Sequence, residues 1–231
     1  MRLESVVVGD GVRLSVAHFS ASRTGLLPVL CIPGLTRNLK DFSELAAALA
    51  RSGRDVYALS LPGRGLSDHA RDPARYHAAA YRDDVLAAMD ALGVARAVLV
   101  GTSLGGIVSL LLNAAAPERV AGIVLNDVGV RLAPEGIARI LGYVTAAQPE
   151  VDSLDAAAAQ IRALNEVAFP GRDADFWKRF ALRTFRAGED GRWRLDYDPR
   201  IGAALLNAPP VDLPAAFALT RGKRVSCCAA P

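Results

Sequence analysis

The sequence has few cysteines, few histidines, no long apolar run and no cluster of like charges. Its three cysteines, of which Cys227 and Cys228 are adjacent, form neither a disulfide framework nor a spaced metal site, so we expect no disulfide and no metal. The net charge of +3 is small for 231 residues, and the basic residues are scattered, which argues against nucleic acid or an acidic membrane surface as a partner. No stretch approaches the roughly 18 apolar residues of a membrane span, and the first residues lack a leader pattern. We therefore expect a cytoplasmic protein.

The first 130 residues alternate strand-like and helix-like segments. A hairpin with a Gly-Asp-Gly turn comes first, because β-branched runs flank that turn. The strands predicted after it are 27–32, 55–60, 96–101 and 119–127, and the helices predicted between them are 41–53, 78–94 and 104–116. Continuous apolar strands separated by helices predict a mostly parallel sheet covered on both faces. The predicted fold class is therefore α/β, with a doubly wound sheet.

The pattern changes near Arg131. Three helical segments follow, at 134–148, 154–169 and 173–188, and none of the intervening residues forms a strand of the core type. We therefore expect a sheet-containing core at 1–130, a helical cap at 131–215 and the beginning of a further strand at 216–231.

A serine stands at the junction between a predicted strand and a predicted helix, in the stretch Gly101-Thr102-Ser103-Leu104-Gly105. A tight turn between two buried elements leaves no room for side chains two residues before and after its tip, which explains Gly101 and Gly105. The turn would expose the Ser103 hydroxyl above the carboxyl ends of the strands. The adjoining helix start would offer the backbone N–H of Leu104 to an oxyanion. The pattern predicts a catalytic nucleophile at Ser103.

This motif, with segments 30–49, 55–68 and 98–127, resembles the α/β-hydrolase family of the type with a serine nucleophile and a helical cap. The resemblance covers about residues 3–225. It implies hydrolysis of carboxylic esters or related acyl compounds through an acyl-enzyme, without a cofactor, on a small, apolar, ester-like substrate. In the family the strand before this loop usually ends in His-Gly. Pro33 replaces that histidine here, while Gly34 and Leu35 keep the backbone positions, so the N–H of Leu35 is expected to be the second oxyanion donor.

Two further groups of residues are expected to have structural roles. In the loop 61–68, Gly63 and Gly65 permit tight turns, and Arg64 and Asp68 are interpreted as hydrogen-bonding residues that fix the loop. The cap aromatics, which either pack inside the cap or line an apolar pocket, are Phe176, Trp177, Phe180 and Trp193.

The set of catalytic residues that the resemblance implies is incomplete in this sequence. The family order is serine, acid, histidine, yet His18, His69 and His77 all precede Ser103, and we interpret none of them as the base. Asp127 stands where some relatives carry the acid, after the sixth strand, while others place it after the seventh. Without a histidine such a serine loses about a millionfold in turnover, so we expect the chain to be nearly inactive.

The segment from Ser226 to Pro231 is unusual for a buried strand. With GC-rich codons, the same bases read one position earlier would encode Leu-Leu-Leu-Arg-Gly-Ala, which is a strand and its turn. We hypothesise that this tail is a frameshifted reading and that the chain is truncated. The alternatives for function are a carbon–carbon bond hydrolase, a haloperoxidase-like relative, and a binding protein of the same fold without catalysis.

Overall fold

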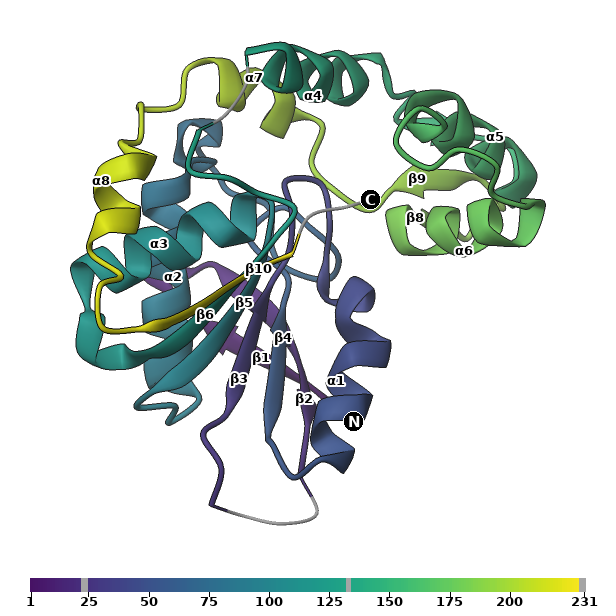
Figure 1. The fold of residues 1–231 in the computed structure, drawn as a ribbon. Helices are drawn as coiled ribbons and strands as arrows, with labels where there is room; N and C mark the ends of the chain where they lie inside the picture. Colours follow the sequence, from purple (N-terminus) through teal and green to yellow (C-terminus); the bar gives the residue numbers. More distant parts are fainter. Residues whose placement is uncertain (22–24, 132–133, 229–231) are drawn as a thin grey trace.

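A computed structural model describes residues 1–21, 25–131 and 134–228, and Figure 1 shows one large sheet at its centre. The strand order in this sheet is β1-β2-β4-β3-β5-β6-β10. The strands are β1 (Arg2–Val7), β2 (Arg13–Phe19), β3 (Val29–Ile32), β4 (Val56–Leu59), β5 (Ala97–Thr102), β6 (Val120–Asn126) and β10 (Arg224–Cys228). β1 and β2 pair antiparallel at one edge, and the strands from β4 to β10 run parallel.

Helices cover both faces of this sheet. α1 (Ser43–Arg51) lies on one face, and the other is covered by α2 (Ala78–Ala91), α3 (Leu104–Ala115) and α8 (Leu213–Ala218) (Figure 1). Short 3-10 helices occur at Gly9–Gly11, Leu39–Phe42, Pro73–Arg75 and Pro117–Arg119. The predicted α/β class with a doubly wound, mostly parallel sheet is confirmed.

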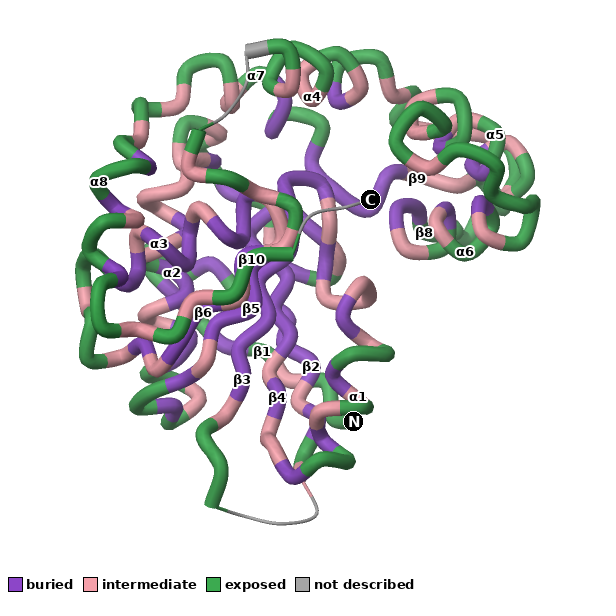
Figure 2. Tube along the Cα trace, viewed as in Figure 1, coloured by how far each residue is buried: buried purple, intermediate pink, exposed green. Residues whose placement is uncertain are grey.

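All four residues of β3 are apolar, because the strand is buried on both faces of the sheet. Leu30 and Ile32 pack in the core under α2 and α3, whereas Val29 and Cys31 pack in the core under α1. A strand buried on both faces needs apolar side chains at every position. Figure 2 shows the central strands as the buried part of the molecule.

The segment expected as a helical cap arches over the carboxyl ends of the strands (Figure 1). Its helices are α4 (Pro134–Ala146), α5 (Leu154–Asn165), α6 (Ala174–Thr184) and α7 (Arg200–Leu206). It also contains a small antiparallel sheet of β7 (Glu150–Val151), β9 (Trp193–Leu195) and β8 (Phe185–Ala187), in that order. The cap segment is therefore not purely helical.

The helix predicted over 173–188 ends at Thr184, and the chain turns into the hairpin of β8 and β9. Phe185 and Leu195 are paired in this hairpin, and both side chains are buried. The hairpin therefore places Phe185 in the core of the cap. Asp190-Gly191 lies in the turn, with Gly191 at φ 80°. This dipeptide, between two segments that alternate apolar and charged residues, is a hairpin signal that the helical interpretation passed over.

The predicted boundary between 215 and 216 falls inside α8. This helix belongs with the core, because Leu213 and Ala216 are buried and the Asn113 side-chain amide on α3 donates to the carbonyl of Leu219 just after it. The strand expected within 216–231 is β10, which forms the exposed edge of the sheet beside β6 (Figure 2). Of the tail from Ser226 to Pro231, residues 229–231 lie outside the described part of the chain.

Within the described ranges, no helix is both long enough and apolar enough to cross a membrane.

Candidate active site

Ser103 occupies the tip of the turn between β5 and α3 with φ 50° and ψ −114°, a conformation that is strained for a residue with a side chain. A Cβ at Gly101 would lie 2.3 Å from the carbonyl oxygen of Gly105. A Cβ at Gly105 would lie 2.0 Å from the carbonyl oxygen of Ile32. Both clashes are with backbone, which cannot move aside easily, so glycine is required at these two positions.

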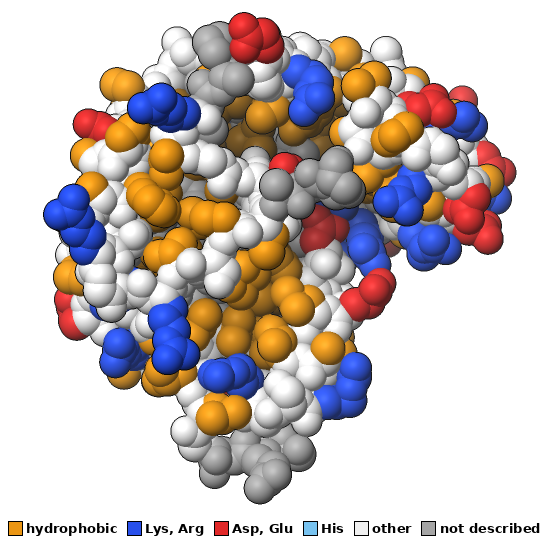
Figure 3. Space-filling model, in the orientation of Figure 1, with side chains coloured by type: hydrophobic (Ala, Val, Ile, Leu, Met, Phe, Trp, Pro, Cys, Tyr) orange, Lys and Arg blue, Asp and Glu red, His pale blue; other side chains and the backbone are white. Residues whose placement is uncertain are grey.

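The strand register brings Ser103 and Asp127 to the same edge of the sheet. Thr102 at the end of β5 pairs with Asn126 at the end of β6, and the Ser103 N–H donates to the Asn126 carbonyl at 2.9 Å. Ser103 and Asp127 are the residues that directly follow these two strands. Both line a cavity of ≈ 900 Å³ between the sheet edge and the cap, and Leu35 lines it as well. In Figure 3, acidic and basic side chains meet beside the hollow between the core and the lobe formed by α5 and α6.

The two amides expected at an oxyanion site are available. The N–H groups of Leu35 and Leu104 make no hydrogen bond to any other residue of the described ranges. The backbone of Leu35 is fixed by Arg64, which is fully buried. Arg64 donates from Nε to the Leu35 carbonyl at 2.8 Å and from Nη1 to the Tyr81 hydroxyl at 2.6 Å. Asp68 in the same loop accepts from Arg13. These contacts agree with the interpretation of Arg64 and Asp68 as residues that fix the loop.

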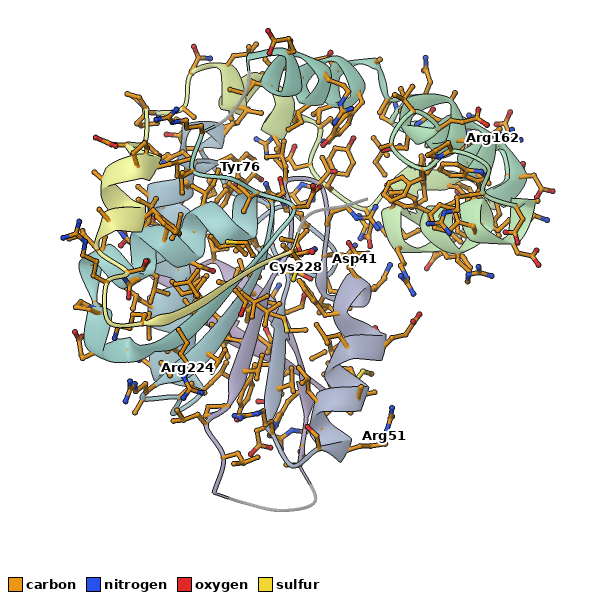
Figure 4. The ribbon with its side chains drawn as sticks, in the orientation of Figure 1. Asp41, Arg51, Tyr76, Arg162, Arg224 and Cys228 are labelled. Carbon is orange, nitrogen blue, oxygen red and sulfur yellow. The ribbon has the colours of Figure 1, made fainter. Side chains whose placement is uncertain are left out.

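Asp127 has a left-handed backbone at φ 53°, which aspartate tolerates better than most residues. Its N–H donates to the Cys228 carbonyl at 2.7 Å, so the end of β10 fixes its backbone. Figure 4 shows Cys228 at this upper edge of the sheet. Within the described residues, neither the Asp127 carboxylate nor the Ser103 hydroxyl makes a side-chain hydrogen bond, and the two are therefore not bonded to each other.

None of the three histidines lines the cavity of Ser103. His18 lies near the start of β4, stacked on Tyr57 at 4.3 Å, with Asp55 at 3.2 Å from its Nε2. His69 has its Nδ1 3.5 Å from the Asp198 carboxylate. His77 caps α2 by accepting from the Ala80 N–H.

The cap contributes aromatic side chains to the cavity, but not the full set that the sequence singled out. Phe176 and Phe180 line it, while Trp177 is buried inside the cap and Trp193 is half-buried outside the cavity. Three aromatic lining residues were not anticipated: Phe169, Tyr143 and Tyr197. Burial raises the pKa of Tyr143 and raises the pKa of Tyr197 to about 12, so both phenols stay protonated at neutral pH.

Arginines also line the cavity, and the sequence interpretation missed them. Arg37 makes two hydrogen bonds to the Asp41 carboxylate, at 2.7 and 2.6 Å, and its guanidinium lies 4.4 Å from the centre of the Phe180 ring. Asp41 lies below the cap, in the 3-10 helix that precedes α1 (Figure 4). The signal for the cap arginines was their spacing: they occur at the positions of a helix stripe that otherwise carries apolar residues.

The return from the cap to the core runs beside the two core loops. Asp196 accepts from the Lys40 ammonium at 2.8 Å and from the Asn38 side-chain amide at 3.1 Å. Two residues later, Asp198 accepts from the Tyr76 hydroxyl at 2.7 Å and from Arg200. Burial raises the pKa of Asp198, but the hydrogen bonds from Arg200 and Tyr76 outweigh it and hold that pKa at about 2.

Within the ranges 1–21, 25–131 and 134–228, no group of three or more histidine, cysteine, aspartate or glutamate side chains could hold a metal ion.

Residues 28–201 match the alpha/beta hydrolase fold family, so the chain belongs to this family, as the motifs indicated. A crystal structure of an alpha/beta hydrolase from Novosphingobium aromaticivorans is similar over 98% of this chain and 80% of its own, with 37% identity and a TM-score of 0.89. A 3-hydroxybutyrate-oligomer hydrolase from Cupriavidus necator is 28% identical over 185 residues, which are 79% of this chain and 62% of that protein. A 2-hydroxymuconate semialdehyde hydrolase from a Pseudomonas species is 38% identical over 59% of this chain and 48% of its own length. The chain thus spans less than two thirds of these two curated relatives.

Proposed function

We propose that the chain is a hydrolase of carboxylic esters or related acyl compounds in which Ser103 is the nucleophile. The single observation that carries this proposal is the strained backbone of Ser103 in the lining of the cavity, together with two amides without other partners. Strain of this kind persists only where the surrounding structure enforces it, and it is typical of functional sites. The name of one relative, a hydrolase of a 3-hydroxybutyrate oligomer, supports ester hydrolysis. The name of the other, a hydrolase of 2-hydroxymuconate semialdehyde, supports hydrolysis alone, because that compound contains no ester.

In the proposed reaction the Ser103 oxygen attacks the carbonyl carbon of the ester. The carbonyl electrons move onto its oxygen, which the N–H groups of Leu35 and Leu104 stabilise. Collapse of this intermediate expels the alkoxide, which leaves as the alcohol after taking up, through water, the proton that the Ser103 hydroxyl gives up, and the acyl group stays on Ser103. Water then attacks the acyl-enzyme, releases the acid and restores the hydroxyl.

The proton of Ser103 lacks a histidine acceptor among the described lining residues. A serine hydrolase without its histidine retains about a thousandfold acceleration over water, from the oxyanion site and from substrate binding. Asp127 in the same cavity is the proposed acid of the site. We therefore expect slow turnover from this chain.

A fluorophosphonate probe tests the nucleophile. We expect slow labelling of the chain at a single serine, located by peptide mass spectrometry at Ser103, and no labelling of Ser103→Ala. Ser52→Ala, which removes an exposed serine after α1, is the matched control and should label like the parent. Labelling at another serine, or equal labelling of Ser103→Ala, would exclude this nucleophile.

The absence of histidine from the described cavity lining favours one second candidate, a binding protein that retains the fold and the cavity. For that function the probe would leave Ser103 unmodified, while an ester would still bind in the cavity. Calorimetry with a short ester, carried out beside the labelling experiment, separates the two.

A further inference from the structure

Of the three cap helices that line the cavity of Ser103, α4 and α6 place arginines on their cavity side. On α4 the lining residues are Gly136, Arg139, Ile140 and Tyr143, and on α6 they are Phe176, Arg179, Phe180 and Arg183. Both sets follow the spacing i, i+3, i+4 and i+7, which is one face of a helix. The same faces carry aliphatic and aromatic lining residues, and Arg139 and Arg179 on them are exposed, so their guanidinium groups are accessible to a ligand in the cavity.

The charges of the cavity do not balance. Four arginines and three carboxylates line it. Two of the arginines are paired: Arg37 with Asp41 inside the core, and Arg183 of the cap with Glu44 of the core. Arg139 and Arg179 have no ion pair or hydrogen bond with any residue in the described ranges, and the remaining carboxylate is that of Asp127 beside Ser103.

We infer that the substrate carries a carboxylate and that Arg139 and Arg179 recognise it; this inference deepens the proposed function and rests on it. A guanidinium matches the geometry of a carboxylate and binds it through charge-assisted hydrogen bonds. The lining exceeds neutrality by one positive charge, which fits one carboxylate better than a phosphate dianion. The aromatic residues of the same lining would hold the apolar part of an acidic ester.

Binding to Ser103→Ala tests this inference without hydrolysis of the probe. Calorimetry would compare monomethyl glutarate, which has one ester and one carboxylate, with dimethyl glutarate, which is neutral. We expect the monoester to bind roughly tenfold tighter or more, the usual worth of a charged hydrogen bond. The preference should weaken as salt is raised. Equal affinities, or tighter binding of the diester, would overturn the inference.

Three variants in the same background assign the residues. Arg139→Gln and Arg179→Gln should each reduce the preference, and the double variant should bind both esters equally. The control is Arg186→Gln, which removes an exposed cap arginine on β8 that does not line the cavity, and it should keep the full preference. A preference that survives the double variant, or one that Arg186→Gln also removes, contradicts the assignment.

The anion itself is tested by competition. Acetate should displace the monoester at lower concentration than inorganic phosphate does, and the reverse order would replace the carboxylate by a phosphate. Because these measurements use Ser103→Ala, they are independent of the nucleophile. A chain whose Ser103 resists fluorophosphonate while the carboxylate preference persists would fail the proposed function and retain an acid-binding cavity.

Discussion

The turn at Ser103 and the cap helices α4 and α6 face the same cavity but are held by different kinds of contact. At the turn, backbone packs on backbone: Gly105 lies against the carbonyl of Ile32, and Gly101 against that of Gly105. In α4, by contrast, a Cβ added at Gly136 or Gly142 would meet nothing within 4 Å. The position of the proposed nucleophile is therefore fixed by the main chain, while the opposite wall is defined by side chains that can be exchanged.

This difference separates the parts of the site that tolerate substitution from those that do not. Substitutions of the cap arginines and aromatics should therefore leave the turn undisturbed. The loops that join the two regions, around Asn38, Lys40 and Tyr76, hold the return segment at Asp196 and Asp198. These contacts are polar, so they make the association of cap and core sensitive to pH and to substitution.

The largest difference between the turn and the cap is expected when one glycine in each region is replaced by alanine. Gly105→Ala should lower the free energy of unfolding by about 3 kcal/mol or more, because the Cβ would meet backbone atoms that cannot yield. Gly142→Ala in α4 should leave stability equal or raise it by up to about 1 kcal/mol, since alanine favours helix and the space is open. Urea unfolding followed by circular dichroism measures both. Equal effects of the two substitutions would show that the turn relaxes as easily as the cap.

A second test concerns the junction between the two regions at Asp198. Its folded pKa of about 2 lies below the ordinary value of 3.8, so the contribution of the carboxylate to stability is complete above pH 4 and is lost as the pH falls toward 2. The difference corresponds to about 2 kcal/mol. Thermal unfolding from pH 6 to pH 2 should show the parent losing its advantage over Asp198→Asn in that interval.

The control for this titration is Glu189→Gln, which removes an exposed carboxylate in the β8–β9 turn that has no ion pair in the described ranges. Its melting temperature should follow that of the parent at each pH. A constant gap between the parent and Asp198→Asn down to pH 2 would contradict the lowered pKa.

The smallest effect is expected at the outer rim, where Arg183 pairs with Glu44 at 2.7 Å and the Glu44 side chain is 86% exposed. Exposed ion pairs contribute little because solvent screens them, so Glu44→Gln should change stability by less than about 0.5 kcal/mol. Urea unfolding at low salt gives the value. A loss comparable to that of Asp198→Asn would mean that the rim, rather than the buried loops, holds the cap to the core.

The same contrast explains how far the sequence could be interpreted. The alternation of apolar strands and helices predicted the sheet, and the two glycines around Ser103 predicted the turn. Both predictions succeeded because backbone geometry dictates these sequence patterns. The β8–β9 hairpin was missed, since a helical pattern ran through Phe185. Arg139 and Arg179 escaped notice because an arginine in an amphipathic helix resembles a solvated surface residue until the facing elements are known. The roles of Ser103, Asp127, Leu35 and Leu104 stay predictions until the labelling and binding experiments are done.

The bond from the Asp127 N–H to the Cys228 carbonyl couples the proposed acid to the last strand of the sheet. The acceptor is a backbone carbonyl, so the hydrogen bond does not depend on which side chain residue 228 has. Any residue that pairs with β6 in this register could accept from the Asp127 N–H. Substitutions of Cys228 should therefore leave Asp127 in place, whereas a proline or an insertion that shifts the strand would misplace it. The identity of the edge strand matters less to the site than its alignment with β6.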